Sequence, residues 1–477
     1  MSVLLWSILI ASALLLAGVV LRARLDVLQR FFVPASVAGG LVGFVLVQMA
    51  LRVPAPDGST APAIVDHVRA LAENLRGWPS FLIAVVFAGL LLERGERRPA
   101  TPGGAARGAA MAGVMVWIIV LGQVALGLLA TWLVIRPAGY DVPAAFGQLI
   151  EAGFAGGHGT AGALGDIYAT ILDFADGRDL GFTMATIGIV YSVISGIVLV
   201  NIGVRRGWTR RGRVEIEPVS GLETRHAPTP MAFARVGADV IDPLAFQLVL
   251  VAMAFLLGAG LRELFIWLAD LAIPAEARFD DVRRAVGNVP LFLFALIGGW
   301  GVRHGLQLMR LGDLLDDASI RRIVGVAMDF LIVAAIASLR IDVIGAYMGP
   351  LALLCGLGFV WTAVCLVVLS RRLLPAEHWF ELGLINYGMS TGTTAQGFML
   401  LRLVDKDLES GAAEDYALAA PLSAPFVGGG ILTMSLPVIL TQVSLPLAIG
   451  VLVAACVMLY GIGRTLHRAR HGSDLPS

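Results

Sequence analysis

Long apolar segments recur along the whole chain of 477 residues, and they limit what it can fold into. A helix that crosses the hydrocarbon core of a bilayer needs about 20 consecutive apolar residues. Charged residues make up only 15% of the sequence, whereas an ordinary soluble domain carries about 25%. The sequence therefore predicts an all-α polytopic membrane protein. We expect eleven spans, at about 3–22, 31–52, 78–93, 108–135, 181–204, 243–262, 286–305, 323–339, 345–370, 414–440 and 444–463.

Arginine predicts the orientation of these spans. If the N-terminus lies outside, the loops that face the cytoplasm carry 25 of the 35 basic residues, seven of them in segment 205–242. The positive-inside rule requires such an excess, so we expect the C-terminus in the cytoplasm. A secretory signal requires a positively charged segment before its apolar run, but no Lys or Arg precedes the first span here. The expected location is therefore the inner membrane of a bacterial cell, with multiple passes.

Two stretches interrupt the apolar pattern. Segment 143–172 has six glycines among the thirteen residues from Gly153 to Gly165, and segment 381–404 contains the polar run "NYGMSTGTTAQG". Irregular backbone in contact with lipid leaves peptide groups unpaired, at a cost on the order of several kcal/mol each. It is tolerated at membrane depth where it is packed in protein or lines a watery cavity. Both stretches are therefore expected to be re-entrant hairpins.

The hairpins occupy matching places in two halves of the chain. Each follows four spans and precedes a fifth, so the expected halves are 1–204 and 243–440. A cytoplasmic linker at 205–242 joins them, and an extra helix with a cytoplasmic tail follows at 441–477. Because five spans is an odd number, the second half inserts upside down. The hairpins then enter from opposite sides, and we expect their tips to meet near the midplane, as in secondary transporters.

The second span of each half carries the same two features. Both begin with Val-Pro and carry a glycine pair further along: Val33-Pro34 with Gly39-Gly40, and Val289-Pro290 with Gly298-Gly299. This correspondence favours an internal repeat.

The hairpin tips carry groups that suit an ion or a carboxylate. Glycine lets backbone amides approach a ligand without an intervening Cβ. A short helix that begins at mid-membrane directs free N–H groups at the cavity, which suits a carboxylate, while carbonyl ends suit a cation. Hydroxyls can serve either ligand, because each donates and accepts. They are Thr160, Ser390, Thr391, Thr393 and Thr394.

Three segments have a distinctive composition: "FFVPASVAGGLVGF" at 31–44, "AGGHGTAGA" at 155–163 and "INYGMSTGTTAQGF" at 385–398. They resemble segments of the glutamate:sodium symporters of the GltS type. The second is similar to the family's Gly-Gly-His-Gly-Thr hairpin tip, and the third to its second hairpin. The similarity covers most of residues 30 to 440. It implies ten spans in inverted repeats, a homodimer, and sodium-driven uptake of glutamate or a related small carboxylate by an elevator-like movement.

The resemblance also implies where ligands bind. The substrate-binding residues would be Gly157, His158, Gly159, Thr160, Ser390, Thr391, Gly392, Thr393 and Thr394. Sodium would lie near these tips, and no other cofactor is implied. Three residues are candidates for coupling the ion: Glu151, Asn386 and Asp329. Glu151 and Asp329 stand where the family has small polar residues, so proton coupling is the alternative to sodium.

Other functions fit parts of the sequence. Gly388 to Gly392 matches the Gly-x-Ser-x-Gly pattern of serine hydrolases, with His158 as base for Ser390. That pattern requires a strand-to-helix turn, and no strand is expected. His158 is equally compatible with an interior structural histidine, and glycine-rich hairpins also line channels. The zero net charge suggests no nucleic-acid partner. We therefore expect a carrier for a small anion rather than an enzyme.

Overall fold

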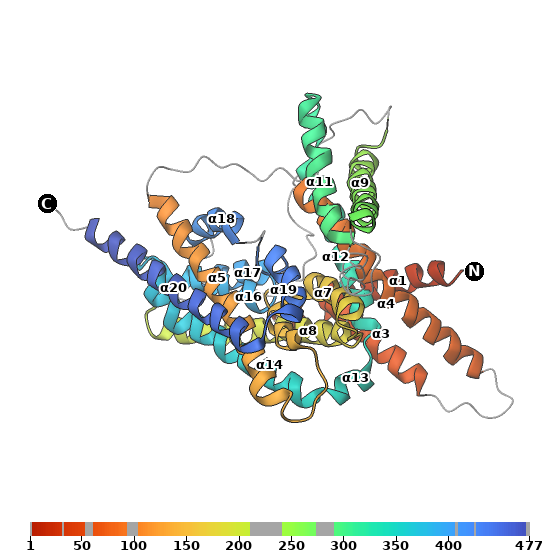
Figure 1. The fold of residues 1–477 in the computed structure, drawn as a ribbon, viewed down its shortest axis with the longest axis horizontal. Helices are drawn as coiled ribbons and strands as arrows, with labels where there is room; N and C mark the ends of the chain where they lie inside the picture. The colour runs from red at the N-terminus through yellow and green to blue at the C-terminus, as the bar shows by residue number, and fades with distance from the viewer. Residues whose placement is uncertain are drawn as a thin grey trace.

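The computed structural model describes residues 2–30, 33–52, 61–92, 104–209, 241–272, 291–405, 409–423 and 426–473. Within these ranges every regular element is a helix and none is a strand. Six of the helices are long and apolar enough to cross a membrane. The chain is therefore an all-α polytopic membrane protein, as the sequence predicts (Figure 1).

Ten of the eleven predicted spans coincide with a helix. The predicted span 78–93 is the last part of a longer helix. Two predicted features lie outside the described residues: the Val289-Pro290 pair and residues 210–240 of the linker. In chain order the helices are α1 (Val3–Arg24), α2 (Asp26–Arg30), α3 (Ala35–Leu51), α4 (Ala61–Leu92), α5 (Gly104–Ala130), α6 (Leu149–Gly153), α7 (Gly157–Ile171), α8 (Gly177–Arg205), α9 (Pro243–Ala272), α11 (Leu291–Leu308), α12 (Asp317–Ala337), α13 (Ile341–Ala346), α14 (Met348–Val364), α15 (Ser370–Leu373), α16 (Trp379–Thr391), α17 (Thr394–Arg402), α18 (Ala412–Ser423), α19 (Ile431–Gln442) and α20 (Leu445–Ser473).

Local chemistry explains where some of these helices begin. The Ser2 hydroxyl accepts a hydrogen bond from the Leu5 N–H at 3.3 Å at the start of α1. The Asp316 carboxylate accepts one from the Ser319 N–H at 3.1 Å at the start of α12. Such caps satisfy N–H groups of the first turn that have no partner inside the helix.

Six helices pack together into what we call the scaffold group: α1, α3, α4, α9, α11 and α12. Within it α1 packs on α3 and α9 packs on α11, while α3 contacts α12 and α11 contacts α4. The three helices that precede the linker therefore interlock with the three that follow it. Figure 1 shows α1, α3 and α4 near the N-terminus, with α9 and α11 projecting to one side.

The two outer helix pairs of the scaffold group pack in the same way. A Cβ atom on Gly39 of α3 would collide with the Leu14 carbonyl of α1. A Cβ atom on Gly298 of α11 would likewise collide with the Ala254 carbonyl of α9. In both pairs the absence of a side chain lets two helix backbones touch.

The neighbouring glycines face helices of the other half of the chain. A Cβ atom on Gly40 of α3 would lie 2.8 Å from the Ile336 Cβ of α12, and one on Gly299 of α11 would collide with the Ala88 carbonyl of α4. Each glycine pair thus lets one helix pack tightly on two neighbours, which gives a physical reason for its recurrence.

The second set of helices, which we call the hairpin group, consists of α5 to α8, α14 and α16 to α20. The central helix is α5, which contacts α14, α18 and α20. Both stretches predicted to be hairpins fold as two helices joined by a turn. Hairpin 1 consists of α6 and α7, preceded by the 3-10 helix η2 (Ala144–Gln148), and hairpin 2 consists of α16 and α17. In Figure 1 the C-terminal helix α20 lies at the end of the molecule opposite the N-terminus.

The prediction of a single tenth span at 414–440 is wrong. This range holds two helices, α18 and α19, separated by a segment that includes Gly428, Gly429 and Gly430. Gly428 has a φ of 67° and Gly429 a φ of 109°, a region that disfavours residues with a side chain. The apolar composition predicted a span, but the glycine run within it breaks the helix.

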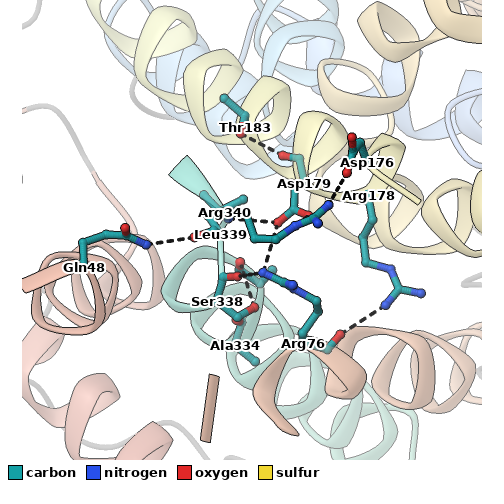
Figure 2. Close-up of polar contacts among 11 residues, drawn as sticks. Gln48, Arg76, Asp176, Arg178, Asp179, Thr183, Ala334, Ser338, Leu339 and Arg340 are labelled. Carbon is teal, nitrogen blue, oxygen red and sulfur yellow. Dashed lines mark hydrogen bonds and ion pairs between the residues drawn. The ribbon is translucent and has the colours of Figure 1, made fainter. Parts of the chain in front are cut away.

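An ion network joins the two groups (Figure 2). Arg340, which follows α12, donates from Nε to the Asp179 carboxylate of α8 at 2.9 Å, and its backbone N–H donates to the other oxygen at 3.1 Å. Arg76 of α4 lies 3.7 Å from Asp179 and donates to the Ser338 carbonyl at 2.6 Å. Arg340 also pairs with Asp176. The network therefore ties the start of α8 to the scaffold helices α4 and α12.

Candidate functional site

Hairpin 1 turns at a glycine. α6 ends at Gly153, and α7 begins at Gly157, whose φ of 69° lies in the left-handed region. A residue with a side chain in that conformation costs about 1–2 kcal/mol. The Gly156 N–H donates to the Glu151 carbonyl at 2.9 Å and closes the turn. The chain therefore reverses here with little side-chain bulk.

Hairpin 2 turns at Gly392, between the end of α16 at Thr391 and the start of α17 at Thr394. The Thr393 hydroxyl accepts a hydrogen bond from the Gln396 N–H, and Gln396 Oε1 accepts one from the Thr393 N–H, each at 3.2 Å. This reciprocal pair is a capping box. The Thr393 hydroxyl is thus engaged in starting a helix.

The two tips touch inside the hairpin group, as the sequence analysis expected. A Cβ atom added to Gly157 would lie 3.6 Å from the Gly392 carbonyl oxygen. Helix α8 lines the contact, because a Cβ atom on Gly188 would lie 2.5 Å from the Thr391 carbonyl oxygen and 2.9 Å from the Phe154 ring. Segments distant in sequence therefore form one site.

The break between α18 and α19 reaches the same place. A Cβ atom on Gly428 would lie 3.6 Å from the Ala155 carbonyl oxygen, and Gly429 packs directly against the Thr160 side chain. The Thr160 hydroxyl donates to the Gly428 carbonyl at 3.5 Å. Three interruptions of helical structure thus converge at the tip of hairpin 1.

Three helices begin at this convergence: α7 at Gly157, α17 at Thr394 and α19 at Ile431. A helix N-terminus carries a partial positive charge and unpaired N–H groups, so it attracts anions. Helix α17 is capped by its own Thr393, whereas no side chain caps α7 at Gly156. The start of α7 is therefore well placed to bind the carboxylate of a ligand.

Glu151 is fully buried beside the third break. Its Oε1 accepts hydrogen bonds from the Thr433 hydroxyl at 2.7 Å and from the Gly428 N–H at 3.0 Å. The Gln148 amide nitrogen lies 3.5 Å from the other carboxylate oxygen and donates to the Thr433 carbonyl at 2.7 Å. Glu151 and Gln148 thus tie hairpin 1 to the start of α19.

A cavity of about 20 Å³ lies next to Glu151, which is room for one water molecule. Its polar lining residues are Gln148, Glu151 and Thr433. The remaining lining residues are apolar and come from α5, α20 and the region of α19: Val120, Leu121, Val124, Val427, Leu432, Leu436 and Leu452. In the part of the chain that the structure describes, Gln148 Oε1 is buried without a hydrogen-bond partner.

The remaining predicted hydroxyls of hairpin 2 bond within the protein. Ser390 and Thr391 donate to the Tyr387 carbonyl at 3.3 and 2.6 Å. The Thr394 hydroxyl lies 3.4 Å from the Tyr416 hydroxyl of α18. Each hydroxyl that donates to a carbonyl keeps its lone pairs, so it can still accept from a ligand or contact a cation.

His158 hydrogen-bonds to α8. Its Nε2 lies 3.1 Å from the Thr186 hydroxyl, and its ring stacks on Phe182 with the centroids 6.2 Å apart. When Thr186 donates its proton to the Phe182 carbonyl, 2.9 Å away, the histidine nitrogen acts as the donor to Thr186. Ser390 bonds to a different partner, so the serine–histidine pair of the hydrolase alternative is not hydrogen-bonded.

The three remaining predicted site residues have different surroundings, and no contact joins Asp329 to the tips. Gly159 faces the scaffold group, where a Cβ atom on it would lie 2.9 Å from Ile83 Cδ1 and 3.4 Å from Met328 Cε. Asp329 follows Met328 on α12, and its side chain is exposed. Asn386 is buried in α16, and both of its side-chain polar atoms lack a hydrogen-bond partner among the described residues.

The sequence analysis missed Gln123, Gln148, Thr433 and the third break. Gln123 of α5 is buried and donates to the Ser390 carbonyl at 2.7 Å. The three consecutive glycines at 428–430 were a detectable signal for the break. Buried glutamines within apolar segments were a weaker signal, and Thr433 carried none.

A hard cation would have to use carbonyl and hydroxyl oxygens at these breaks. Over the described ranges, no group of three or more His, Cys, Asp or Glu side chains is placed to hold a metal ion. The Gly392 carbonyl lies against Gly157 at the tips, and the Gly428 carbonyl at the third break keeps a second lone pair beside its hydrogen bond from Thr160. In comparisons with known proteins, no family model matches the chain, and no well-characterised protein is significantly similar in sequence.

Proposed function

We propose that this chain is a secondary active transporter that imports a small carboxylate, with glutamate as the first candidate substrate and sodium as the first candidate coupling ion. The observation that carries the proposal is the convergence of three helix breaks inside a polytopic membrane protein. Transporters of this kind bind substrates and ions at interrupted helices near the midplane. The resemblance of 155–163 and 385–398 to glutamate:sodium symporter hairpins supports the choice of substrate and ion.

In this proposal the substrate carboxylate binds at the uncapped start of α7. The backbone amides of Gly157 and Gly159 approach it closely, and the His158 and Thr160 side chains flank it. Hairpin 2 closes the site through Gly392, whose carbonyl lies against Gly157. No described cationic side chain lies among these residues, so helix N-termini supply the positive potential.

We further infer that access alternates by movement of the hairpin group along a stationary scaffold group. The interlocked packing of α1, α3 and α4 with α9, α11 and α12 supports inverted repeats of 1–204 and 243–440. We place the N-terminus outside, the C-terminus in the cytoplasm, and two copies in a homodimer. Hairpin 1 packs on α4 and α12 through α7. In this orientation, hairpin 1 seals the outer side.

Purified protein in liposomes tests the proposal directly. We expect saturable counterflow of radiolabelled L-glutamate, and accumulation that requires an inward sodium gradient. A thermal-shift screen against amino and organic acids, in sodium and in potassium, identifies the substrate if glutamate is inactive. A protein that shows neither a ligand-dependent shift nor counterflow with any acid would overturn the proposal.

The tip of hairpin 1 offers a matched pair of variants. Gly157→Ala forces a side chain into a φ of 69° at the tip, whereas Gly207→Ala does so at a φ of 66° after α8, where a Cβ atom meets nothing. Both substitutions carry a similar backbone strain of about 1–2 kcal/mol. We expect Gly157→Ala to lower counterflow on the order of tenfold and Gly207→Ala to transport like wild type. Equal loss in both variants would remove the tip from the mechanism.

A further inference from the structure

Glu151 is buried with no cation beside it. Its side chain is 0% exposed, and no ion pair joins it to any described residue. Its side-chain hydrogen bonds among the described residues all come from donors, which include the Thr433 hydroxyl, the Gly428 N–H and the Gln148 amide nitrogen. Burying a charge is costly unless it is paired, and hydrogen bonds with helix-end amides offset only part of that cost. A neutral carboxyl group removes the cost.

The cavity beside Glu151 suits a water molecule better than sodium. Hard cations take about six oxygen ligands. The cavity has room for one water and is lined by Glu151 and by Gln148, whose Oε1 has no hydrogen-bond partner among the described residues, while its other walls are apolar apart from Thr433. A sodium ion there would lack most of its ligands. A proton needs only the carboxylate and a hydrogen-bond acceptor.

We propose that Glu151 is a proton-coupling site, occupied while the break between α18 and α19 is closed on hairpin 1 and emptied when that break opens. The inference rests on the proposed transport function and names a coupling ion for this site, with sodium left to the hairpin tips. A hydronium ion transfers its proton to Glu151 Oε2 and becomes water. The new O–H then donates to one water in the cavity, and that water donates to Gln148 Oε1, which otherwise has no partner among the described residues.

Charged and titratable groups near Glu151 engage other partners. Tyr168 of α7 lies near Glu151, and its hydroxyl donates to the Ala145 carbonyl at 2.9 Å. Arg107 and Arg205 lie at the distant ends of α5 and α8. The other groups on the helices that pack against α6 bond as follows: His158 with Thr186, Asp166 with Arg178, Asp179 with Arg340, Tyr191 with the Phe359 carbonyl, and Cys355 with Met184.

Difference infrared spectroscopy of the purified protein, between acidic and alkaline buffer, detects the proton without any substrate. We expect wild type to show a C=O band of a protonated, water-poor carboxyl group that disappears as the pH rises. Glu151→Gln should abolish this band, whereas Asp66→Asn, which alters an exposed acid on α4, should retain it. If Glu151→Gln leaves every carboxyl band in place, Glu151 remains ionised and the proposal is overturned.

Two further arms keep the test decisive. Thr433→Val keeps the carboxyl group but removes the hydroxyl that donates to it, so the band should move to higher frequency. This variant serves if Glu151→Gln does not fold, and an unmoved band contradicts the assignment. The spectra are repeated with sodium in place of potassium at fixed pH. Loss of the band on addition of sodium would show that the site takes sodium and would overturn proton binding.

Transport then separates this inference from the proposed function. In liposomes Glu151→Gln should keep glutamate counterflow, because a neutral group can cycle in both directions. It should lose the part of the accumulation that an imposed pH gradient adds to sodium-driven uptake. If counterflow survives in Glu151→Gln and pH-driven accumulation is unchanged, the proton site is contradicted and the proposed transport function stands. Absence of counterflow in wild type contradicts the proposed transport function. The infrared experiment still reports whether Glu151 binds a proton.

Discussion

Thr393 shows how one side chain acquires a role from its neighbours. The sequence suggested that its hydroxyl contacts substrate, and in the structure that hydroxyl caps α17 through Gln396. Loss of an N-cap costs about 1 kcal/mol. We therefore expect Thr393→Val to lower the melting temperature of the purified protein in detergent. Thr393→Ser retains the hydroxyl and should have the same melting temperature as wild type. If the Thr393→Val and Thr393→Ser variants have the same melting temperature, the cap makes no contribution to stability.

Helix pairs in the scaffold group depend on glycines that permit backbone contact. Gly39→Ala places a methyl group against the Leu14 carbonyl, whereas Gly450→Ala on α20 places one in open space. An alanine in an open helix position is favoured over glycine by about 1 kcal/mol. We expect Gly39→Ala to lower the melting temperature and Gly450→Ala to keep or raise it. The same loss is expected for Gly298→Ala. Equal melting of all three variants would contradict close packing as the reason for these glycines.

The helices and both hairpins were predictable because apolar length and glycine content are local properties of the sequence. The break between α18 and α19 was not predicted, because the apolar residues on both sides of Gly428 outweigh three glycines in a count of hydrophobicity. The position of Glu151 against Thr433 was beyond reach, since it depends on a contact between segments far apart in the chain. What a buried acid does is decided by such partners, and these appear only in three dimensions.

The molecule as a whole consists of two helix groups joined by hairpin 1 and by the ion network of Figure 2. If the hairpin group moves along the scaffold group, the bonds from Asp179 to Arg340 and Arg76 must break, because one partner lies on each side. Asp179 is the better buried partner, with its side chain 6% exposed against 33% for Arg340. In the proposed orientation the network lies at the outer side, so it stabilises the state in which that side is closed.

Removing one charge from this network should therefore shift the equilibrium toward the outward-open state. A coupling of about 1.4 kcal/mol corresponds to a tenfold change in population. In a background in which Cys355, Cys365 and Cys456 are replaced by alanine, we expect Asp179→Asn to raise labelling of a single introduced cysteine, Thr394→Cys, by a membrane-impermeant maleimide from the outside by about tenfold. The control is Asp66→Asn, which breaks an exposed pair with Arg69 inside α4 and should change nothing. The charge swap Asp179→Arg with Arg340→Asp should restore protection. Unchanged labelling in a folded Asp179→Asn protein would mean that the two helix groups do not separate at this network.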